Sequence, residues 1–244
     1  MQWNISNIKF INKKNEFYKI LSETYPITEE NKYTHTSIND PKGAWHVPDE
    51  NLETFYKFYV STYYKYNIDI HLTEKHKNIA PILIDLDFKY KSNDNNRKFD
   101  NNFIKDIIKL YNKIIKEIYL DVNDELLDSY VMLKKNPILN KNDNNEYYKD
   151  GIHIIYPNII TKPEYQKWMR YELLENNRDK LDIIFKNFKC INSYEDIFDE
   201  KVIYDTNWQL YGSLKPNNIK YNLYNIYDSN CIEKNNIYKE YTKE

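Results

Sequence analysis

The sequence predicts a mixed fold of the α/β or α+β class. Stretches whose apolar residues recur at helical spacing interleave with stretches that alternate apolar and polar residues, as strands do. No internal repeat and no flexible linker interrupts the 244 residues, a length that suits one large domain or two lobes around a shared cleft. We expect one domain over 1–244, with an α/β part over about 1–80, a motif-bearing core over about 80–228 and a tail or linker over about 229–244.

The N-terminal elements are predicted from apolar periodicity and from turn residues. A helix is expected over 7–24, and a second helix over about 49–66 has Asp49 as its N-cap candidate. Between these helices, residues 32–47 predict short strands around a turn at Asp40-Pro41-Lys42-Gly43. The remaining elements of this part are strands near 68–73 and over 80–88.

The C-terminal part continues the alternation of helices and strands. A capping box formed by Thr161 and Glu164 predicts the start of a long helical stretch that ends near residue 188. The other expected elements, in chain order, are a polar turn at 91–98, a helix over 102–120, a strand over 129–135, an Asn-rich loop over 136–148, a strand over 151–156 and β-like segments through 202–227.

Composition limits the functional classes. Lys and Arg number 35 against 37 Asp and Glu, so the net charge of −2 is not that of a general nucleic-acid binder, and any basic surface would have to be local. Cys190 and Cys231 lack the spacing of a zinc site and suggest a reducing compartment. No apolar run reaches the length of a membrane span, and the N-terminus does not read as a signal peptide, so we expect an intracellular protein.

The chain has only three glycines, Gly43, Gly151 and Gly212, among many Asn, Lys, Ile and Tyr residues. Such a composition is typical of an AT-rich genome, in which glycine codons are under pressure. The remaining glycines therefore mark positions where the backbone requires them.

The stretch PILIDLDFKY, residues 81–90, carries two carboxylates on one face of a predicted strand. Because side chains alternate between the faces of a strand, Asp85 and Asp87 point the same way, about 6–7 Å apart along the chain. An edge strand with a solvated polar face is the simplest alternative. The apolar run before the pair favours a central strand instead, where crowded carboxylates are best compensated by a divalent cation such as Mg²⁺ or Mn²⁺.

The stretch KDGIHIIYP places a histidine and a lysine around one of the three glycines. An isolated histidine is more often a structural residue. Here Gly151 has no Cβ to obstruct a ligand, and Lys149 and His153 supply positive charge, so the stretch suits the close approach of a phosphate chain.

The stretch IFDEKVIYDTNWQLYGSLKPNN holds the third set of polar candidates. Either Asp199 or Asp205 could supply a third carboxylate to a two-metal site. Lys215 taken alone is an ordinary solvated loop lysine. With Ser213 and a glycine beside it, the lysine could instead belong to a second phosphate contact.

Together, these residues favour a two-metal site for phosphoryl or nucleotidyl transfer. A metal-dependent nuclease would use the same carboxylates, but the basic side chains favour a triphosphate substrate, because a nuclease has no pyrophosphate leaving group to hold. The non-enzymatic alternative is a DNA-binding or adaptor module that keeps the fold without the activity.

The motifs ILIDLDF, KDGIHIIYP and FDEKV, followed by NWQLYGSLKP, occur in an order that resembles the catalytic core of the archaeo-eukaryotic primase superfamily. Within it, the chain is most similar to the primase half of the primase–helicases of nucleocytoplasmic large DNA viruses. HTSINDPKGAW and LTEKH also look like that viral group, so the resemblance covers about residues 34–218. It implies a two-lobed core with an RRM-like C-terminal module and with the motifs in the cleft between the lobes.

The resemblance also assigns roles to residues. Asp85 and Asp87 match an acidic pair that binds metal, and Phe198-Asp199 matches an apolar residue followed by a metal-binding aspartate, which favours Asp199 over Asp205. The implied site has Asp85, Asp87 and Asp199 as catalytic and metal-binding residues, and Lys149, Gly151, His153, Ser213 and Lys215 as nucleotide-binding residues.

Three features depart from the family pattern. Gly151 stands where many relatives have serine, Gln209 stands where the eukaryotic branch often has arginine, and the sequence has no glycine-rich Walker loop of a helicase. The chain is therefore expected to be a free-standing or excised primase part.

The activity that the resemblance implies is template-dependent nucleotidyl transfer, by a primase or primase–polymerase. Such an enzyme would use two Mg²⁺ or Mn²⁺ ions, NTPs or dNTPs, and a single-stranded DNA template. The resemblance further implies a helicase domain or protein as partner, no membrane, and a viral replication site in the host cytoplasm.

Overall fold

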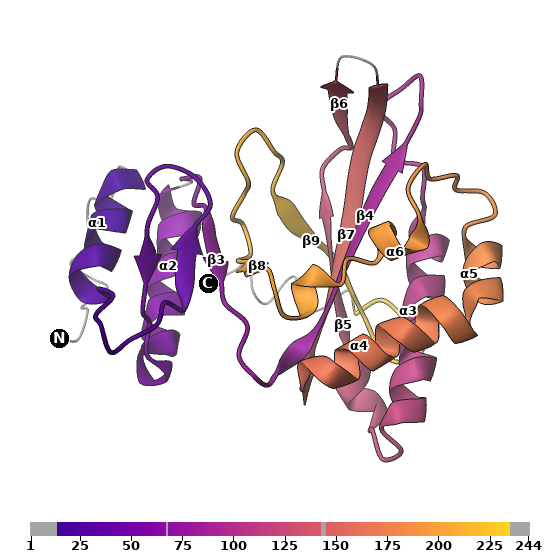
Figure 1. The fold of residues 1–244 in the computed structure, drawn as a ribbon, viewed down its shortest axis with the longest axis horizontal. Coiled ribbons are helices and arrows are strands. Elements are labelled where there is room, and N and C mark those ends of the chain that lie inside the picture. The colour runs from indigo at the N-terminus through magenta and orange to yellow at the C-terminus, as the bar shows by residue number, and fades with distance from the viewer. Residues whose placement is uncertain (1–13, 67, 143–144, 235–244) are drawn as a thin grey trace. The chain divides into compact units, whose positions relative to one another are not determined.

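The computed structural model describes residues 14–66, 68–142 and 145–234, and the chain forms two units (Figure 1). The first unit combines the residues up to His76 with Asn207–Lys220, and the second combines Lys77–Thr206 with the residues from Tyr221 onward. The strands of both sheets pair antiparallel, so the predicted mixed fold is confirmed and is of the α+β class. Within the described residues, no helix is long and apolar enough to cross a membrane.

The first unit contains a four-stranded sheet and two main helices. The strands, in sheet order, are β2 (Ala44–Trp45), β1 (His35–Ser37), β3 (Leu72–Glu74) and β8 (Trp208–Gln209). The helices are α1 (Lys14–Thr24) and α2 (Leu52–Tyr66), and the short 3-10 helix η2 (Asp49–Asn51) precedes α2. Aromatic side chains of the two helices form much of the core, as where the Phe17 and Phe58 rings stack with their centroids 5.1 Å apart.

The first-unit predictions are confirmed in type but shifted in their boundaries. Residues 7–13 of the expected first helix lie outside the described residues, and the strand expected near 68–73 is β3 at 72–74. The assignment of Asp49 as N-cap is wrong. Residue 49 already belongs to the 3-10 turn, whose first bond runs from the Asn51 N–H to the Pro48 carbonyl, so Pro48 takes the cap position.

In the second unit, a sheet of five described strands carries the carboxylate motif. The strands are β4 (Ala80–Tyr90), β7 (Asn145–Thr161), β5 (Ser129–Lys134) and β9 (Tyr221–Tyr227) in sheet order, with β6 (Ile138–Asn142) paired to β7. The helical segments are α3 (Asn101–Ile118), η3 (Asp124–Leu127), α4 (Pro163–Tyr171), the π-helical η4 (Glu172–Asn176), α5 (Arg178–Ile184), α6 (Tyr194–Ile197) and η5 (Lys201–Ile203).

Helix α3 and the strands share one hydrophobic core. Asp100 caps the helix, its carboxylate accepting the Phe103 N–H at 2.9 Å, and apolar residues then recur at helical spacing. The buried side of α3 belongs to the same cluster as Leu86 of β4 and Ile152 of β7. Because side chains alternate along a strand, Asp85 and Asp87 of β4 and His153 of β7 lie on the other face of the sheet.

Several predictions for the second unit are wrong in detail. The Asn-rich segment 136–148 is not a loop, because it contains β6 and the start of β7, which form a hairpin. Thr161 does not cap α4, since it is the last residue of β7 and pairs with Ala80, which leaves Lys162 as the N-cap. The long helical stretch is divided into α4, η4 and α5, and 202–227 is only partly β-like, because η5 precedes β8 and β9.

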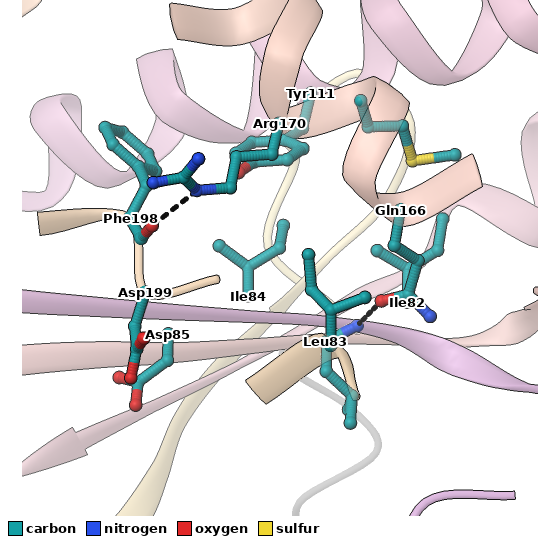
Figure 2. Close-up of a pocket in the computed structure, with 11 residues that line it drawn as sticks. Ile82, Leu83, Ile84, Asp85, Tyr111, Gln166, Arg170, Phe198 and Asp199 are labelled. Atoms are coloured by element: carbon teal, nitrogen blue, oxygen red, sulfur yellow. Dashed lines mark hydrogen bonds between the residues drawn. The ribbon is translucent and has the colours of Figure 1, made fainter. Parts of the chain in front are cut away.

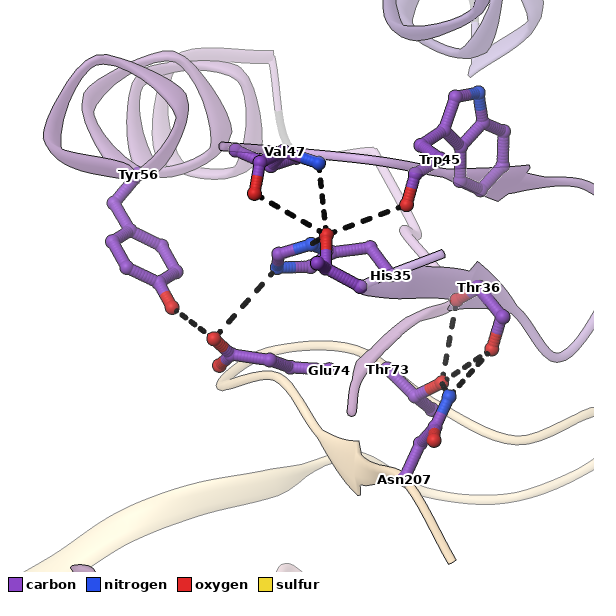
Figure 3. A network of polar contacts seen from close by, with 9 residues as sticks. His35, Thr36, Trp45, Val47, Tyr56, Thr73, Glu74 and Asn207 are labelled. Atoms are coloured by element: carbon purple, nitrogen blue, oxygen red, sulfur yellow. Dashed lines mark hydrogen bonds and ion pairs between the residues drawn. The ribbon is translucent and has the colours of Figure 1, made fainter. Parts of the chain in front are cut away.

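A polar network in the first unit surrounds a fully buried histidine (Figure 3). The His35 ring shares a hydrogen bond of 2.9 Å between Nδ1 and the Thr34 hydroxyl and packs on Phe55, with the ring centroids 4.5 Å apart. Its Nε2 lies 4.0 Å from the Glu74 carboxylate, which also accepts the Tyr56 hydroxyl at 2.7 Å. Burial lowers the pKa of His35 from 6.5 to about 4, so the ring is neutral in the folded protein at neutral pH.

His35 should make the folded protein less stable as the pH falls. Its pKa is lower in the folded state than in the unfolded state, so the unfolded state binds more protons once the pH drops below about 6.5. We expect the free energy of unfolding to decrease as the pH falls from about 6.5 towards about 4, and His35→Gln to reduce this dependence.

The measurement is denaturant unfolding at a series of pH values for the wild type, His35→Gln and His46→Gln. His46 is a matched control because it is only partly buried and bonds to the Lys32 carbonyl at an exposed position. Equal pH dependence in the wild type and His35→Gln would contradict the role of His35.

Candidate active site

Asp85 and Asp87 lie on the same face of β4, as the alternation of the sequence predicts. Leu86, between them, is fully buried in the core on the opposite face. Across the ladder to β7, Asp85 is paired with His153 and Asp87 is paired with Gly151. The two motifs that the sequence singled out are therefore neighbours on one sheet surface.

Each of these carboxylates has a basic neighbour on β7. The Lys149 ammonium lies 3.2 Å from Asp87 Oδ2, and His153 Nε2 lies 3.5 Å from Asp85 Oδ1. The Asp85 side chain is 13% exposed and the Asp87 side chain 27% exposed, so both carboxylates can still be reached from the surface. The Lys149 ammonium offsets part of the repulsion that two adjacent carboxylates would otherwise experience.

The expectation of a central strand is wrong, because β4 lies at the edge of the sheet and pairs there only with β7 among the described strands. Its outer edge is covered by the segment that leads to Asp199. The Asp199 N–H donates to the Asp85 carbonyl at 3.0 Å, and Phe198 forms a single antiparallel bridge with Leu86. An apolar strand can therefore lie at an edge here, because another part of the chain occupies its hydrogen-bonding groups.

Two further side chains bind the same outer edge. The Gln166 side chain accepts the Leu83 N–H at 3.1 Å and donates to the Pro81 carbonyl at 3.1 Å. The Asn192 side chain accepts the Lys89 N–H at 3.0 Å and donates to the Asp87 carbonyl at 2.8 Å. The edge is thus fixed on both sides of the Asp85 contact.

This arrangement brings Asp199 to Asp85. Both residues line one small pocket, and Figure 2 shows their carboxylates beside each other. The Arg170 guanidinium of α4 holds the segment that carries Asp199, donating to the Phe198 carbonyl at 2.8 Å and to the Glu195 carbonyl at 2.9 Å. Asp205, the other sequence candidate, is exposed and follows η5, outside this pocket.

The sequence did not identify two buried residues near the carboxylates, Lys134 of β5 and Tyr221 of β9. Burial lowers the pKa of Lys134, while the charges of Asp87 and Asp85 act in the opposite direction. Burial and the same two carboxylates raise the pKa of Tyr221 well above its ordinary value. The sequence does contain one indication of Lys134, namely a lysine at the end of the apolar run YVMLK. A lysine that is buried with such a run requires acidic groups near it.

A buried ion pair supports the strand beneath the site. The Arg97 guanidinium binds the fully buried Asp150 carboxylate through two bonds of 2.8 and 3.0 Å and also donates to the Lys134 carbonyl at 2.7 Å. Asp150 in turn accepts the Gly151 N–H at 2.9 Å. Arg97 therefore joins β5 to the segment of β7 that carries Lys149 and Gly151.

The remaining two predicted site residues, Ser213 and Lys215, belong to the first unit. Ser213 is fully buried, and its hydroxyl accepts the Leu72 N–H at 3.0 Å and lies 3.0 Å from the Tyr59 hydroxyl. Lys215 is exposed in the following turn, where its carbonyl accepts the Asn218 N–H. Nearby, Gly212 has a positive φ of 79°, which explains a glycine at this turn.

The carboxylates suit a divalent cation by their chemistry, because Mg²⁺ and Mn²⁺ prefer oxygen ligands. Asp85 and Asp199 are adjacent, whereas Asp87 is engaged by Lys149. Among the described residues, no group of three or more His, Cys, Asp or Glu side chains is arranged to hold a metal ion. By its chemistry the adjacent pair offers oxygen ligands to a cation, whereas a ligand role for Asp87 would require it to leave Lys149.

Comparison with known proteins agrees with the motif order. Residues 34–227 match the family model described as the C962R protein N-terminal AEP domain, where AEP denotes archaeo-eukaryotic primase. The chain is 39% identical over 199 residues to the putative helicase L207/L206 of Acanthamoeba polyphaga mimivirus, an alignment that covers 82% of this chain and 20% of that protein. It is 26% identical over 234 residues to the putative helicase 184R of Invertebrate iridescent virus 6, covering 89% of this chain and 24% of that protein.

The chain thus spans only about a fifth to a quarter of the length of these relatives. The family match, in contrast, covers most of the chain and includes both aspartates of β4, the Gly151–His153 stretch and Asp199. The chain therefore belongs to the archaeo-eukaryotic primase family, in the group of the C962R protein N-terminal domain.

Proposed function

We propose that the protein is a template-dependent nucleotidyltransferase, a DNA primase or primase–polymerase that synthesises primers on single-stranded DNA from NTPs or dNTPs. The observation that carries the proposal is the contact between Asp199 and Asp85 at the edge of β4, with Lys149 and His153 on the adjoining strand. Acidic groups for cations and basic groups for a triphosphate are thus combined on one surface.

Each side chain has a role in this proposal. Asp85, Asp87 and Asp199 would hold two Mg²⁺ or Mn²⁺ ions, which when bound supply charge stabilisation and activation of a primer 3′-hydroxyl. Lys149 and His153 would bind the phosphates of the incoming nucleotide and stabilise the leaving pyrophosphate. They pair with Asp87 and Asp85 in the structure, so nucleotide binding would exchange carboxylate partners for phosphate partners.

Lys215, Ser213 and Gly151 are proposed as further nucleotide-binding residues. Lys215 is exposed and carries a positive charge that would attract a triphosphate. Ser213 is proposed as a nucleotide contact as well, but its hydroxyl would then have to give up the Leu72 N–H.

The proposed partners follow from the relatives. Both curated relatives are named putative helicases and are several times longer than this chain. We propose that the protein acts with a helicase domain or a separate helicase at a viral replication site, in the host cytoplasm.

The direct test is extension on a single-stranded DNA template with labelled NTPs or dNTPs and with Mg²⁺ or Mn²⁺. Template-dependent products support the proposal. Shortening of the template without extension would identify a nuclease, and template binding without either reaction would identify an inactive binding module.

The β4 carboxylates should be essential for incorporation. Asp85→Asn and Asp87→Asn preserve side-chain shape but remove the charge that would hold a cation, so we expect incorporation to fall by roughly a hundredfold or more. The folded state should persist, because both side chains are partly exposed. Extension assays and thermal unfolding of each variant provide the measurement, and a double Asn variant that still extends primers would exclude the proposed metal site.

Asp199→Asn and Asp205→Asn together test which aspartate is the third carboxylate of the site. Asp199→Asn should reduce incorporation as strongly as the β4 variants do, because Asp199 lies beside Asp85, whereas Asp205→Asn should leave it nearly unchanged. Parallel extension assays measure both. If Asp205 were the essential residue, the assignment of the third motif would be wrong.

His153→Gln should act mainly on nucleotide binding. A charge-assisted contact to phosphate contributes roughly 1.5–3 kcal/mol, so nucleotide affinity should weaken about ten- to a hundredfold. Affinity for single-stranded DNA should change little. Nucleotide titration, DNA titration and thermal unfolding on the same variant are needed, since a destabilised protein with unchanged nucleotide affinity would identify His153 as purely structural.

A further inference from the structure

Tyr221 lies across the sheet surface that carries the candidate site. In the ladders, Asp87 is paired with Gly151, and Lys134 is paired with Tyr221. The β5–β7 register pairs Leu133 with Ile152, so Lys134 and Gly151 are the next positions along these two strands. The four residues thus form one row across β4, β7, β5 and β9.

The Tyr221 ring contacts His153. It stacks on the His153 ring with the centroids 3.6 Å apart and the planes 19° from parallel. The Lys134 ammonium lies over the same tyrosine ring, 4.9 Å from its centroid. Both Tyr221 and Lys134 are buried, with 8% and 4% of their surfaces exposed. The stack therefore restricts how His153 can turn.

Gly151 provides the space that Tyr221 occupies. A Cβ atom at residue 151 would lie 2.6 Å from the Tyr221 hydroxyl oxygen and 2.7 Å from the Leu86 carbonyl oxygen. Both distances are shorter than real Cβ contacts, and the Leu86 oxygen belongs to the backbone and cannot easily move. A larger residue would therefore displace Tyr221 or separate the strands.

We propose that Tyr221 is a positioning residue for nucleotide binding and that Gly151 is required to admit it. The tyrosine ring holds the flat face of His153, so that the edge of the imidazole stays directed at Asp85 and at a phosphate that takes its place. This inference rests on the proposed function, because the ligand that His153 meets is the nucleotide. It adds a residue from the last strand of the sheet to the site.

Three variants separate this role from ordinary packing. Tyr221→Leu removes the stack, and Tyr221→Phe keeps it. Tyr227→Leu is the matched control, because Tyr227 is a fully buried tyrosine on the same strand, and its hydroxyl bonds to Asn101, away from the site residues. The measurements are affinity for ATP and for dATP with Mg²⁺, affinity for single-stranded DNA, thermal unfolding, and the NMR shifts of the His153 ring protons.

We expect Tyr221→Leu to weaken nucleotide affinity about three- to tenfold, the range of an aromatic stacking contact, and to shift the His153 protons as the ring current is lost. Tyr221→Phe should bind nucleotide like the wild type. Tyr227→Leu should lose stability but keep nucleotide affinity. Gly151→Ala should mimic Tyr221→Leu, and combining the two should add little, because both act through the same ring.

Other outcomes would overturn the inference. Unchanged nucleotide affinity in Tyr221→Leu, or an equal loss in Tyr227→Leu, would reduce Tyr221 to a packing residue. An equal loss in Tyr221→Phe and Tyr221→Leu would assign the effect to the hydroxyl and not to the stack. A wild-type protein that binds no nucleotide would instead overturn the proposed function, and the His153 shifts would still show whether the stack exists.

Discussion

The candidate site depends on one backbone contact at the edge of β4, where the Asp199 N–H donates to the Asp85 carbonyl. Residues 85 and 199 are far apart in sequence, and this contact places their carboxylates beside each other. Asn192 bonds the same segment to the Asp87 carbonyl of the strand, and Arg170 ties the segment to α4. An edge strand exposes unpaired backbone groups, and here those groups serve to position a third acidic residue.

Charge balance is the second constraint on this surface. Asp85 and Asp87 on one face of the sheet, and the fully buried Asp150 on the other, each require compensation. The compensating cations come from three places, namely Lys149 on β7, Lys134 on β5 and Arg97 before α3. These cations balance the carboxylates without a bound ligand.

Sequence reasoning predicted those parts of the site that depend on local periodicity. The shared face of Asp85 and Asp87 and the strand position of His153 follow from alternation alone. The choice of Asp199 required the family spacing, because its position depends on a contact between distant segments. Lys134, Tyr221 and Arg170 were missed for the same reason. Their contacts join segments that are distant in sequence, and the sequence of one segment does not predict its register or contacts with another. The Thr161 cap failed because pairing with Ala80 extended β7 to that residue.

A crystal structure grown with Mn²⁺ would test the proposed metal site, because the anomalous signal of manganese identifies its position. We expect an ion bound by the carboxylates of Asp85 and Asp199, with the Asp199 N–H still donating to the Asp85 carbonyl. Manganese bound elsewhere on the second unit, or Asp199 separated from the edge of β4, would contradict it.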